Sequence, residues 1–343
     1  MVTGKENAKI LRAIEPEETE IAVEEAVRLL KAGEVVALPT ETVYGLAANA
    51  FSPDAVAKIF KVKGRPSSNP IIVHVSSISM AKKCVRQWTT DAQKLANNFW
   101  PGPLTIVLPK SDIIPPIVTA GGETVGIRFP SHPVIRKVID KCGFPLAAPS
   151  ANISSRISPT TAEHVFKQLG DKIKLIVDGG PCAVGIESTV FDITSQPPRV
   201  LRPGIIHEES LFAALGRRIQ PTNSTDAQHG VLRSPGLLKK HYAPLAKLIC
   251  MEWKTLDELM TNLKDLGCDP KYTRILAYSN LPQDLESWKT TLMPKTATAY
   301  ARALYAELHR CDEEGARWII VQTPPHLPQW EAIHDRLRRA AAT

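Results

Sequence analysis

Residues 35–75 read VVALPTETVYGLAANAFSPDAVAKIFKVKGRPSSNPIIVHV, and this stretch indicates an α/β fold. Its first four residues, 35–38, form an apolar run that predicts a buried strand. The run ends at Pro39 and continues into hydroxyl and acidic side chains. Open α/β sheets usually bind ligands beyond the carboxyl ends of their strands. We therefore expect the chemistry of the protein at the exit of this strand.

A helix and a second strand follow in the same stretch. Ser52 and Pro53 are typical of a helix start, Gly64 is typical of a helix end, and the apolar run 71–75 predicts the next strand. The loop between them has a polar side chain at every second position: Lys63, Arg65, Ser67 and Asn69. In extended backbone, alternate residues share a face, so we expect these four side chains to converge on one polyanion. The alternative is a solvated basic loop, because charged residues are mostly exposed.

The phosphates of a bound nucleotide would have to be held by cationic side chains. The chain contains no G-x-x-x-x-G-K-[ST] motif and therefore no P-loop. Lys63, Arg65 and Arg202 are the candidates, since guanidinium groups match phosphate oxygens bidentately and lysine supplies a compact charge. Arg128 is a further cationic side chain, near the end of a strand expected over 124–129.

Eight short motifs occur in one order between residues 35 and 204. They are PTETVYGL from Pro39, the K-x-R-x-S-x-N run from Lys63, NPIIVH from Asn69, PGPLT from Pro101, IRFP from Ile127, APSAN from Ala148, ESTV from Glu187 and LRPG from Leu201. In these motifs the chain resembles the threonylcarbamoyl-AMP synthases of the long form. That form has a YrdC-like catalytic domain followed by a smaller C-terminal domain.

The resemblance implies a reaction that joins L-threonine, bicarbonate or carbon dioxide, and ATP into L-threonylcarbamoyladenylate with release of pyrophosphate. A partner transferase complex would then deliver the threonylcarbamoyl group to the adenosine beside the tRNA anticodon. The amine first captures the one-carbon unit as a carbamate, whose oxygen attacks the α-phosphorus in line. Catalysis would depend on positioning and on charge stabilisation by Lys63, Arg65, Arg202 and a Mg²⁺ ion carried by the nucleotide, with no metal ligands from the chain.

The resemblance also assigns binding residues. Threonine contacts are implied for Thr42, His74, Arg128 and Ser188. ATP contacts are implied for Arg65, Asn69, Thr124, Ala148, Ser150, Asn152, Ser158, Arg202 and Tyr242.

Structural alternatives exist for three of these residues. Ser158, followed by proline, is also typical of the N-cap of a helix expected over 161–169. His74 lies in an apolar strand, where a lone histidine is often a satisfied buried residue. Ser188 is an ordinary turn residue when taken alone. Two departures from the family pattern are Ser155, where the family usually has glycine, and Gly126, where a larger residue is usual and whose absence is expected to loosen the strand that bears Arg128.

The 343 residues suggest two domains and are ample for a buried core. The net charge of +7 and the pI near 9.0 are compatible with nucleic acid or with small anions. The six cysteines are scattered without a C-x-x-C, which argues against a zinc site and a disulfide framework. The chain has neither a long apolar run nor a secretory signal pattern, so we expect a cytoplasmic protein without a membrane segment.

Sequence organisation predicts a catalytic domain over 1–216, a linker over 217–244 and a small C-terminal domain over 245–343. Strands and helices of the first domain mix without strict alternation, which predicts a twisted mixed sheet. The last domain alternates strand and helix, which is typical of a small Rossmann-like parallel sheet. The linker contains Ser234-Pro235-Gly236 and His241-Tyr242-Ala243-Pro244, which resemble the linker signature of the long form. We expect the linker to close over the active site as a lid, and replacement of His241 and Tyr242 by alanine to lower synthesis with the fold intact.

An RNA-binding module is the main rival interpretation, because the domain is basic and YrdC-like folds are associated with a positively charged concave surface, which would make a weak RNA contact. Only 6% of the residues are aromatic, so stacking platforms for bases are not supported. A carbamoyl-transfer domain of the hydrogenase-maturation type would normally sit beside zinc-finger segments, which the sequence lacks. The synthase interpretation requires Arg65, Arg128 and Arg202 to border one cavity.

Overall fold

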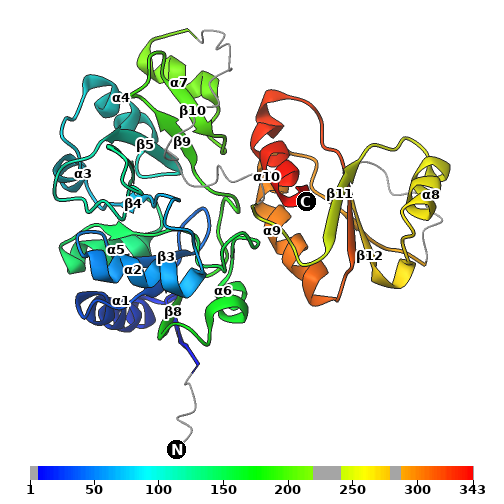
Figure 1. Cartoon of the computed structure of the whole chain (residues 1–343), viewed down its shortest axis with the longest axis horizontal. Helices are drawn as coiled ribbons and strands as arrows, with labels where there is room; N and C mark the ends of the chain where they lie inside the picture. Colours follow the sequence, from blue (N-terminus) through cyan, green and yellow to red (C-terminus); the bar gives the residue numbers. More distant parts are fainter. Residues whose placement is uncertain (1–6, 219–240, 279–286, 343) are drawn as a thin grey trace, which may run out of the picture. The chain divides into compact units, whose positions relative to one another are not determined.

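The computed structural model describes residues 7–218, 241–278 and 287–342, which form two compact units (Figure 1). The first unit contains the described residues up to 154 and those from 158 to 218. The second contains 155–157 together with the described residues from 241 onward. Most of the predicted linker, including Ser234-Pro235-Gly236, lies outside the described residues, and the predicted domain boundaries stay a prediction.

The first unit is built on one sheet of ten strands in the order β1-β8-β2-β3-β7-β4-β6-β5-β9-β10. Parallel and antiparallel neighbours alternate irregularly, so the predicted mixed sheet is confirmed. The strands are β1 (Lys9–Arg12), β2 (Val36–Leu38), β3 (Gly45–Asn49), β4 (Val73–His74), β5 (Leu104–Pro109), β6 (Thr124–Arg128), β7 (Leu146–Ala147), β8 (Leu175–Asp178), β9 (Thr189–Asp192) and β10 (Arg199–Arg202).

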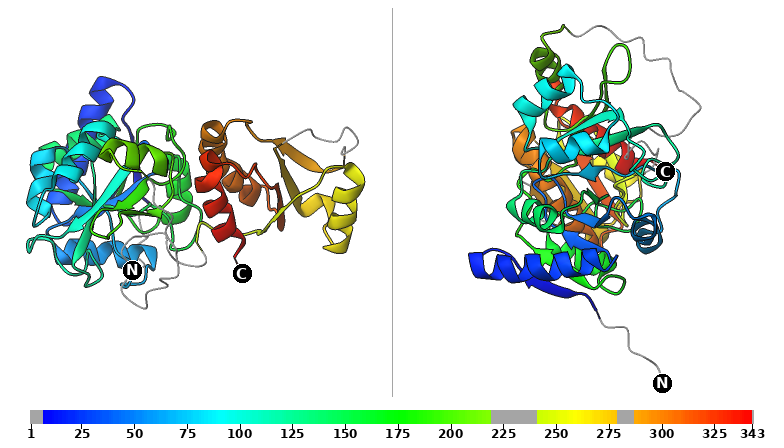
Figure 2. Two further views of the ribbon diagram at one scale, coloured as in Figure 1. Left: turned by 90° about the horizontal axis from the view of Figure 1, so that it is seen from above. Right: turned by 90° about the vertical axis from the view of Figure 1, so that its left-hand side faces the viewer.

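Helices cover both faces of this sheet (Figures 1 and 2). They are α1 (Pro16–Lys31), α2 (Pro53–Lys63), α3 (Ile78–Cys84), α4 (Thr90–Phe99), α5 (Pro133–Cys142), α6 (Ala162–Leu169) and α7 (Glu208–Leu215). On one face, α1 and α5 bury an apolar cluster against β8, β2, β3 and β7. On the other face, α2, α3, α4, α6 and α7 bury the larger cluster.

The face under α1 and α5 carries fewer buried apolar side chains where it continues over β4, β6, β5 and β9. His74 pairs with Leu146, so its side chain lies on the same face as that part of the α1/α5 cluster. Beyond it the buried apolar cluster shrinks to Ile72, Val107 and Val190, with Leu201 against it. Apolar burial is the main stabilising term of a fold. A region of the sheet with few buried apolar side chains is therefore a candidate place for a ligand.

Two local predictions for the first unit were wrong, and one central strand was not predicted. The expected strand 71–75 is reduced to Val73–His74, and the unassigned segment Gly45–Asn49 is a central strand, β3. The loop after α2 is also not extended: Gly64 is left-handed at φ 60°, and the amide of Asn69 donates to the carbonyl of Pro66 at 3.1 Å. Ser67 is exposed. The expected convergence of four alternate side chains therefore does not occur.

The second unit is a four-stranded parallel sheet in the order β11-β14-β12-β13, which confirms the predicted Rossmann-like architecture. Its strands are β11 (Lys247–Met251), β12 (Thr273–Ala277), β13 (Lys289–Leu292) and β14 (Trp318–Gln322). Its helices are α8 (Leu256–Asp265), α9 (Ala297–Glu313) and α10 (Glu331–Ala341), with 3₁₀ turns at Pro270–Tyr272 and Pro328–Trp330.

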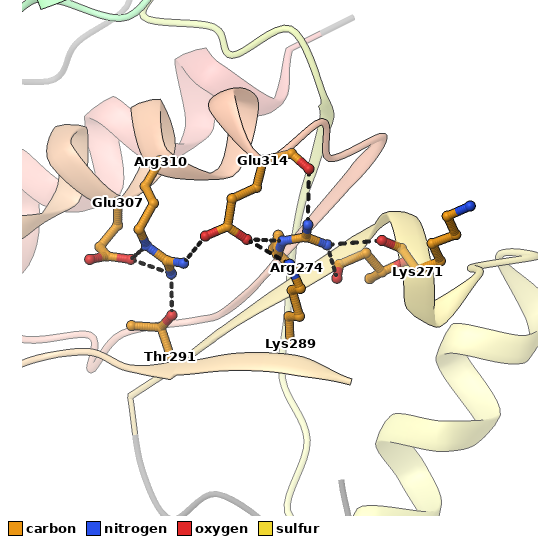
Figure 3. Close-up of polar contacts among 8 residues, drawn as sticks. Lys271, Arg274, Lys289, Thr291, Glu307, Arg310 and Glu314 are labelled. Atoms are coloured by element: carbon orange, nitrogen blue, oxygen red, sulfur yellow. Dashed lines mark hydrogen bonds and ion pairs between the residues drawn. The ribbon is translucent and has the colours of Figure 1, made fainter. Parts of the chain in front are cut away.

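The edge strand β13 escaped prediction because its sequence, KTTL, has no apolar alternation. Polar contacts from α9 hold it instead (Figure 3). Arg310 donates to the hydroxyl of Thr291 at 2.5 Å and to Glu314 at 2.5 Å, and Glu314 also accepts from Arg274 at 2.7 Å. Burial works against the charged carboxylate, but these hydrogen bonds outweigh it and lower the pKa of Glu314 to about 2.

Candidate active site

A row of residues in register crosses the sparsely filled face of the first sheet. His74 of β4 pairs with Arg128 of β6, and Arg128 pairs with Thr105 of β5. Thr105 pairs with Val190 of β9, which in turn pairs with Arg202 of β10. Side chains of directly paired residues point to the same side of a sheet. His74 and Arg128, which are predicted to bind L-threonine, thus share one face of the sheet with Arg202, which is predicted to bind phosphate.

A small hollow lies beside this row. Its lining residues include Pro70, Thr105, Thr124, Gly126 and Val190. A Cβ atom at Gly126 would lie 3.0 Å from the Cγ2 atom of Thr105, so a larger residue at this position would crowd Thr105. Gly126 pairs with Val107 inside a regular ladder, and the expected loosening of β6 is not seen.

Arg128 and Glu41 form a buried ion pair at one end of the row. Their side chains are 4% and 8% exposed, and the Arg128 Nη2 to Glu41 Oε1 distance is 2.8 Å. Arg128 Nη1 also donates to the Thr42 hydroxyl at 2.9 Å. The ion pair is close but poorly aligned, and Arg128 Nε and Nη2 and both Glu41 oxygens lack a hydrogen-bond partner among the described residues. Buried polar groups are nearly always satisfied, so this unused capacity indicates a ligand site.

His74 is buried next to Arg128, and its Nδ1 atom also has no hydrogen-bond partner among the described residues. Burial, followed by the Arg128 charge, lowers the pKa of His74 from 6.5 to about 3. The imidazole is therefore neutral at physiological pH, and it can either donate or accept a hydrogen bond. This suits contact with a substrate hydroxyl.

The lowered pKa of His74 predicts acid sensitivity. Between pH 6.5 and about 3, the unfolded chain binds a proton that the native imidazole excludes, so stability falls as pH falls through this window. One such proton is worth about 1.4 kcal/mol per pH unit. We expect His74→Asn to flatten the dependence of the unfolding free energy on pH in this range, as measured by urea titration. An unchanged slope would show that His74 titrates normally in the native protein.

Ser188 contacts both Thr105, in the middle of the row, and Arg202, at the end of the row away from His74. Its hydroxyl lies 2.8 Å from the hydroxyl of Thr105, and its carbonyl accepts from Arg202 Nε at 3.1 Å and Nη2 at 3.0 Å. Arg202 Nη2 also donates to the Ser188 hydroxyl at 3.1 Å. Thr105, which lies in the PGPLT motif but received no predicted role, therefore positions Ser188.

Removal of the Thr105 hydroxyl tests this connection. Thr105→Val keeps the shape of the side chain but breaks the bond to Ser188, and we expect a loss of about 1 kcal/mol in the free energy of unfolding. Thr105→Ser, which keeps the hydroxyl, serves as the control for this bond. Because Thr105→Ser loses a buried methyl group, each variant is compared with the wild type by urea unfolding, and a Thr105→Val variant as stable as the wild type would show that the bond contributes nothing.

Lys63 holds the loop that carries Ser150 and Asn152. Its Nζ atom donates to the carbonyls of Ser150 and Asn152 at 2.5 Å and to Asn152 Oδ1 at 3.1 Å. The Ser150 hydroxyl also donates to Asn152 Oδ1 at 2.5 Å. Burial, followed by the Arg65 charge, lowers the pKa of Lys63 well below its ordinary value, while the three oxygen acceptors favour the ammonium form. In the structure Lys63 is thus a positioning residue, and its role at the phosphates stays a prediction.

Arg65 and Asn69 lie in the turn after α2. Arg65 donates to the carbonyls of Asn69 at 3.2 Å and Pro70 at 2.8 Å, which orders the segment that lines the hollow. Asn69 is fully buried, and neither atom of its side-chain amide has a hydrogen-bond partner among the described residues. An amide that offers both a donor and an acceptor suits a nucleobase or a phosphate.

Ser158 is not the helix N-cap that was one alternative for it. Thr161 caps α6 by accepting from the amide of His164. The buried Ser158 hydroxyl instead donates to Glu187 Oε1 at 2.6 Å. Glu187, in the ESTV motif, received no predicted role.

The remaining predicted ATP residues fall in different places. Thr124 lines the hollow, and Ala148 is a buried residue whose amide donates to the carbonyl of Ile72, another lining residue, at 3.1 Å. Tyr242 belongs to the second unit, where its ring is fully buried. It has a left-handed backbone at φ 61° and packs against His241 and Tyr305.

The described ranges contain neither a cluster of metal ligands nor a membrane-spanning helix. No group of three or more His, Cys, Asp or Glu side chains has the geometry to hold a metal ion there. Within the same ranges, no helix is both long and apolar enough to cross a membrane.

Comparisons with known proteins show the family of the chain. Residues 28–204 match the Sua5/YciO/YrdC family model, described as Telomere recombination, and residues 206–342 match the model of the threonylcarbamoyl-AMP synthase C-terminal domain. Threonylcarbamoyl-AMP synthase of Pyrococcus abyssi is 37% identical, over 92% of this chain and 93% of its own length. The Bacillus subtilis enzyme of that name is 40% identical, over 93% and 92%. The crystal structure of P. abyssi Sua5 complexed with L-threonine superposes with a TM-score of 0.86 at 36% identity, covering 97% of this chain and 98% of that one. The chain therefore belongs to the two-domain, Sua5-type threonylcarbamoyl-AMP synthase family.

Proposed function

We propose that the polar row and the hollow of the first unit form the active site in which this threonylcarbamoyl-AMP synthase acts. The chain makes threonylcarbamoyl-AMP for the threonylcarbamoyladenosine modification of tRNA. The observation that supports the location of the site is the unused hydrogen-bonding capacity of buried Arg128, Glu41, His74 and Asn69. Bicarbonate or carbon dioxide is the proposed source of the one-carbon unit.

L-threonine is proposed to bind at the Arg128 end of the row. The guanidinium atoms Nε and Nη2 have no aligned hydrogen-bond partner among the described residues, which suits a bidentate carboxylate. The Thr42 hydroxyl is already oriented by Arg128, and neutral His74 is available for the substrate hydroxyl. Ser188, which directly precedes β9, completes the set.

ATP is proposed to bind on the same face of the sheet, beside the row and away from the threonine site, with its phosphates near Arg65 and Arg202. Asn69, Thr124, Ala148, Ser150, Asn152 and Ser158 are the proposed contacts of the nucleotide in the first unit. The carbamate oxygen would attack the α-phosphorus in line, so positioning and positive charge supply the catalysis and no side-chain nucleophile is required. Mg²⁺ is proposed to travel with the nucleotide, because the described residues offer no cluster of metal ligands.

Pyrophosphate release tests the proposal. The full chain, ATP and Mg²⁺ are expected to release pyrophosphate only when both L-threonine and bicarbonate are present. Release that is independent of threonine, or AMP formation without threonylcarbamoyl-AMP, would contradict the assignment. Binding of RNA without nucleotide turnover would instead favour the RNA-binding module. Delivery of the product to a downstream tRNA threonylcarbamoyl transferase complex is part of the same proposal.

Tyr242 calls for a more conservative variant than the double alanine replacement of His241 and Tyr242. Its buried ring packs 5.9 Å from the ring of Tyr305 and 5.2 Å from the Arg336 guanidinium. We expect Tyr242→Ala to destabilise the second unit by about 3–5 kcal/mol, because a buried aromatic side chain is removed. Tyr242→Phe keeps the ring and serves as its matched control, so that thermal melting separates lost packing from a lost hydroxyl contact. A stable Tyr242→Ala variant would contradict this.

A further inference from the structure

We propose that Glu41 binds the ammonium group of L-threonine and makes the site selective for an α-amino acid. The inference deepens the proposed function and rests on it. Glu41 belongs to the PTET segment after β2, and neither the reaction nor the predicted binding residues gave its carboxylate a role. The side chain is buried, which is unusual for glutamate unless it is paired.

The pairing that Glu41 has in the structure is incomplete. Arg128 lies within ion-pair distance, yet neither carboxylate oxygen has an aligned hydrogen-bond donor among the described residues. Other ionisable groups near it do not supply positive charge. Burial lowers the pKa of His132, so its imidazole is neutral at physiological pH, and burial raises the pKa of Cys182 to about 12, so its thiol is neutral. A buried carboxylate in this state gains strongly from a cationic donor.

The cation that fits is the α-ammonium of a zwitterion. Arg128 Nε and Nη2 and both Glu41 oxygens make an ion pair at most, without an aligned hydrogen bond among the described residues, and the two charges are adjacent. An amino acid has its own carboxylate and ammonium on one carbon atom, in the complementary order. Binding of the zwitterion satisfies both members of the buried pair at once, whereas a simple carboxylic acid satisfies only Arg128.

The backbone at Glu41 is held ready for this contact. The Glu41 carbonyl accepts from the amide of Val184 at 2.7 Å, and the Thr42 carbonyl accepts from the amide of Gly185 at 3.1 Å. The Thr42 amide donates to the Thr40 hydroxyl at 3.1 Å. A fixed backbone reduces the conformational entropy lost when the ligand binds.

Two ligands separate recognition of the ammonium from recognition of the carboxylate. (R)-3-hydroxybutanoate has the carboxylate, the hydroxyl and the methyl group of L-threonine but lacks the ammonium. We would measure the dissociation constants of both ligands for the full chain by calorimetry or by competition, in wild type and in Glu41→Gln. Glu123→Gln, which neutralises an exposed carboxylate of the same unit, is the matched control.

Wild type is expected to bind threonine about 10- to 100-fold more tightly than the analogue, the value of a charge-assisted hydrogen bond. Glu41→Gln should remove this preference by weakening threonine alone, and Glu41→Asp should remove part of it. Equal weakening of both ligands would mean that Glu41 only orients Arg128, and tighter binding of both would mean that it competes with the substrate carboxylate. Either result overturns the inference and leaves the proposed function standing. A wild-type chain that does not bind threonine overturns both. If Glu41→Gln does not fold, the wild-type preference and Glu41→Asp decide.

Discussion

Arg128→Ala is expected to abolish threonine-dependent pyrophosphate release, with kcat/KM for threonine reduced about 100-fold or more. Arg128 is a buried cation, and it lies next to Thr42 and His74, which are both predicted to bind L-threonine. Loss of two charge-assisted hydrogen bonds to a carboxylate has this magnitude. Steady-state kinetics with threonine as the varied substrate measures the effect. Activity within a factor of a few of wild type would contradict a carboxylate contact.

The same substitution should also destabilise the first unit, because it leaves Glu41 without its partner. Removal of one member of a buried ion pair costs about 3–5 kcal/mol. The double variant Arg128→Gln with Glu41→Gln leaves no buried charge and is the matched control. It should recover most of the stability in urea unfolding but none of the activity. Recovered activity would show that the charge of Arg128 is not required.

Lys63→Met is expected to raise the KM for ATP by at least about tenfold and to lower stability by about 1–3 kcal/mol. The variant has a similar shape but leaves the Ser150 and Asn152 carbonyls and Asn152 Oδ1 without the donor that holds their loop. Removal of a buried ammonium also relieves its desolvation, so the loss of stability is smaller than the number of bonds suggests. The kinetic effect should dominate.

Lys61→Met is the matched control for Lys63→Met, because Lys61 lies on the same helix and is exposed. It should change neither the KM for ATP nor the unfolding midpoint. If Lys63→Met raises only the KM for threonine, or if both methionine variants behave alike, the loop that carries Ser150 and Asn152 is not part of the ATP site.

The strands that bear the site could be predicted where their hydrophobic pattern is regular. The apolar runs before Pro39 and around Arg128 predicted β2 and β6 to within one residue. The strand β3 was missed because its sequence, GLAAN, has low β propensity. Its extended conformation comes from pairing with β2 on one side and β7 on the other, which no local pattern reveals.

Several side-chain roles were equally hidden from the sequence. The spacing from Lys63 to Asn69 predicted one face, but the turn at Gly64 sends Lys63 to the Asn152 loop. Ser158 and Thr161 are both good cap residues, and only the fold shows that Thr161 is the cap. Glu41 and Thr105 lie inside recognised motifs, yet their partners are far away in the chain. Arg128 follows Glu41 by 87 residues, and Ser188 follows Thr105 by 83 residues.

The central claim is that one face of β4, β6, β5, β9 and β10 holds both substrates. The most direct test is a crystal structure of the full chain with L-threonine and a non-hydrolysable ATP analogue. We predict the threonine carboxylate on Arg128, its ammonium on Glu41, and the phosphates beside Arg65 and Arg202. Electron density that places either ligand on the opposite face of the sheet, away from this row, would contradict the account.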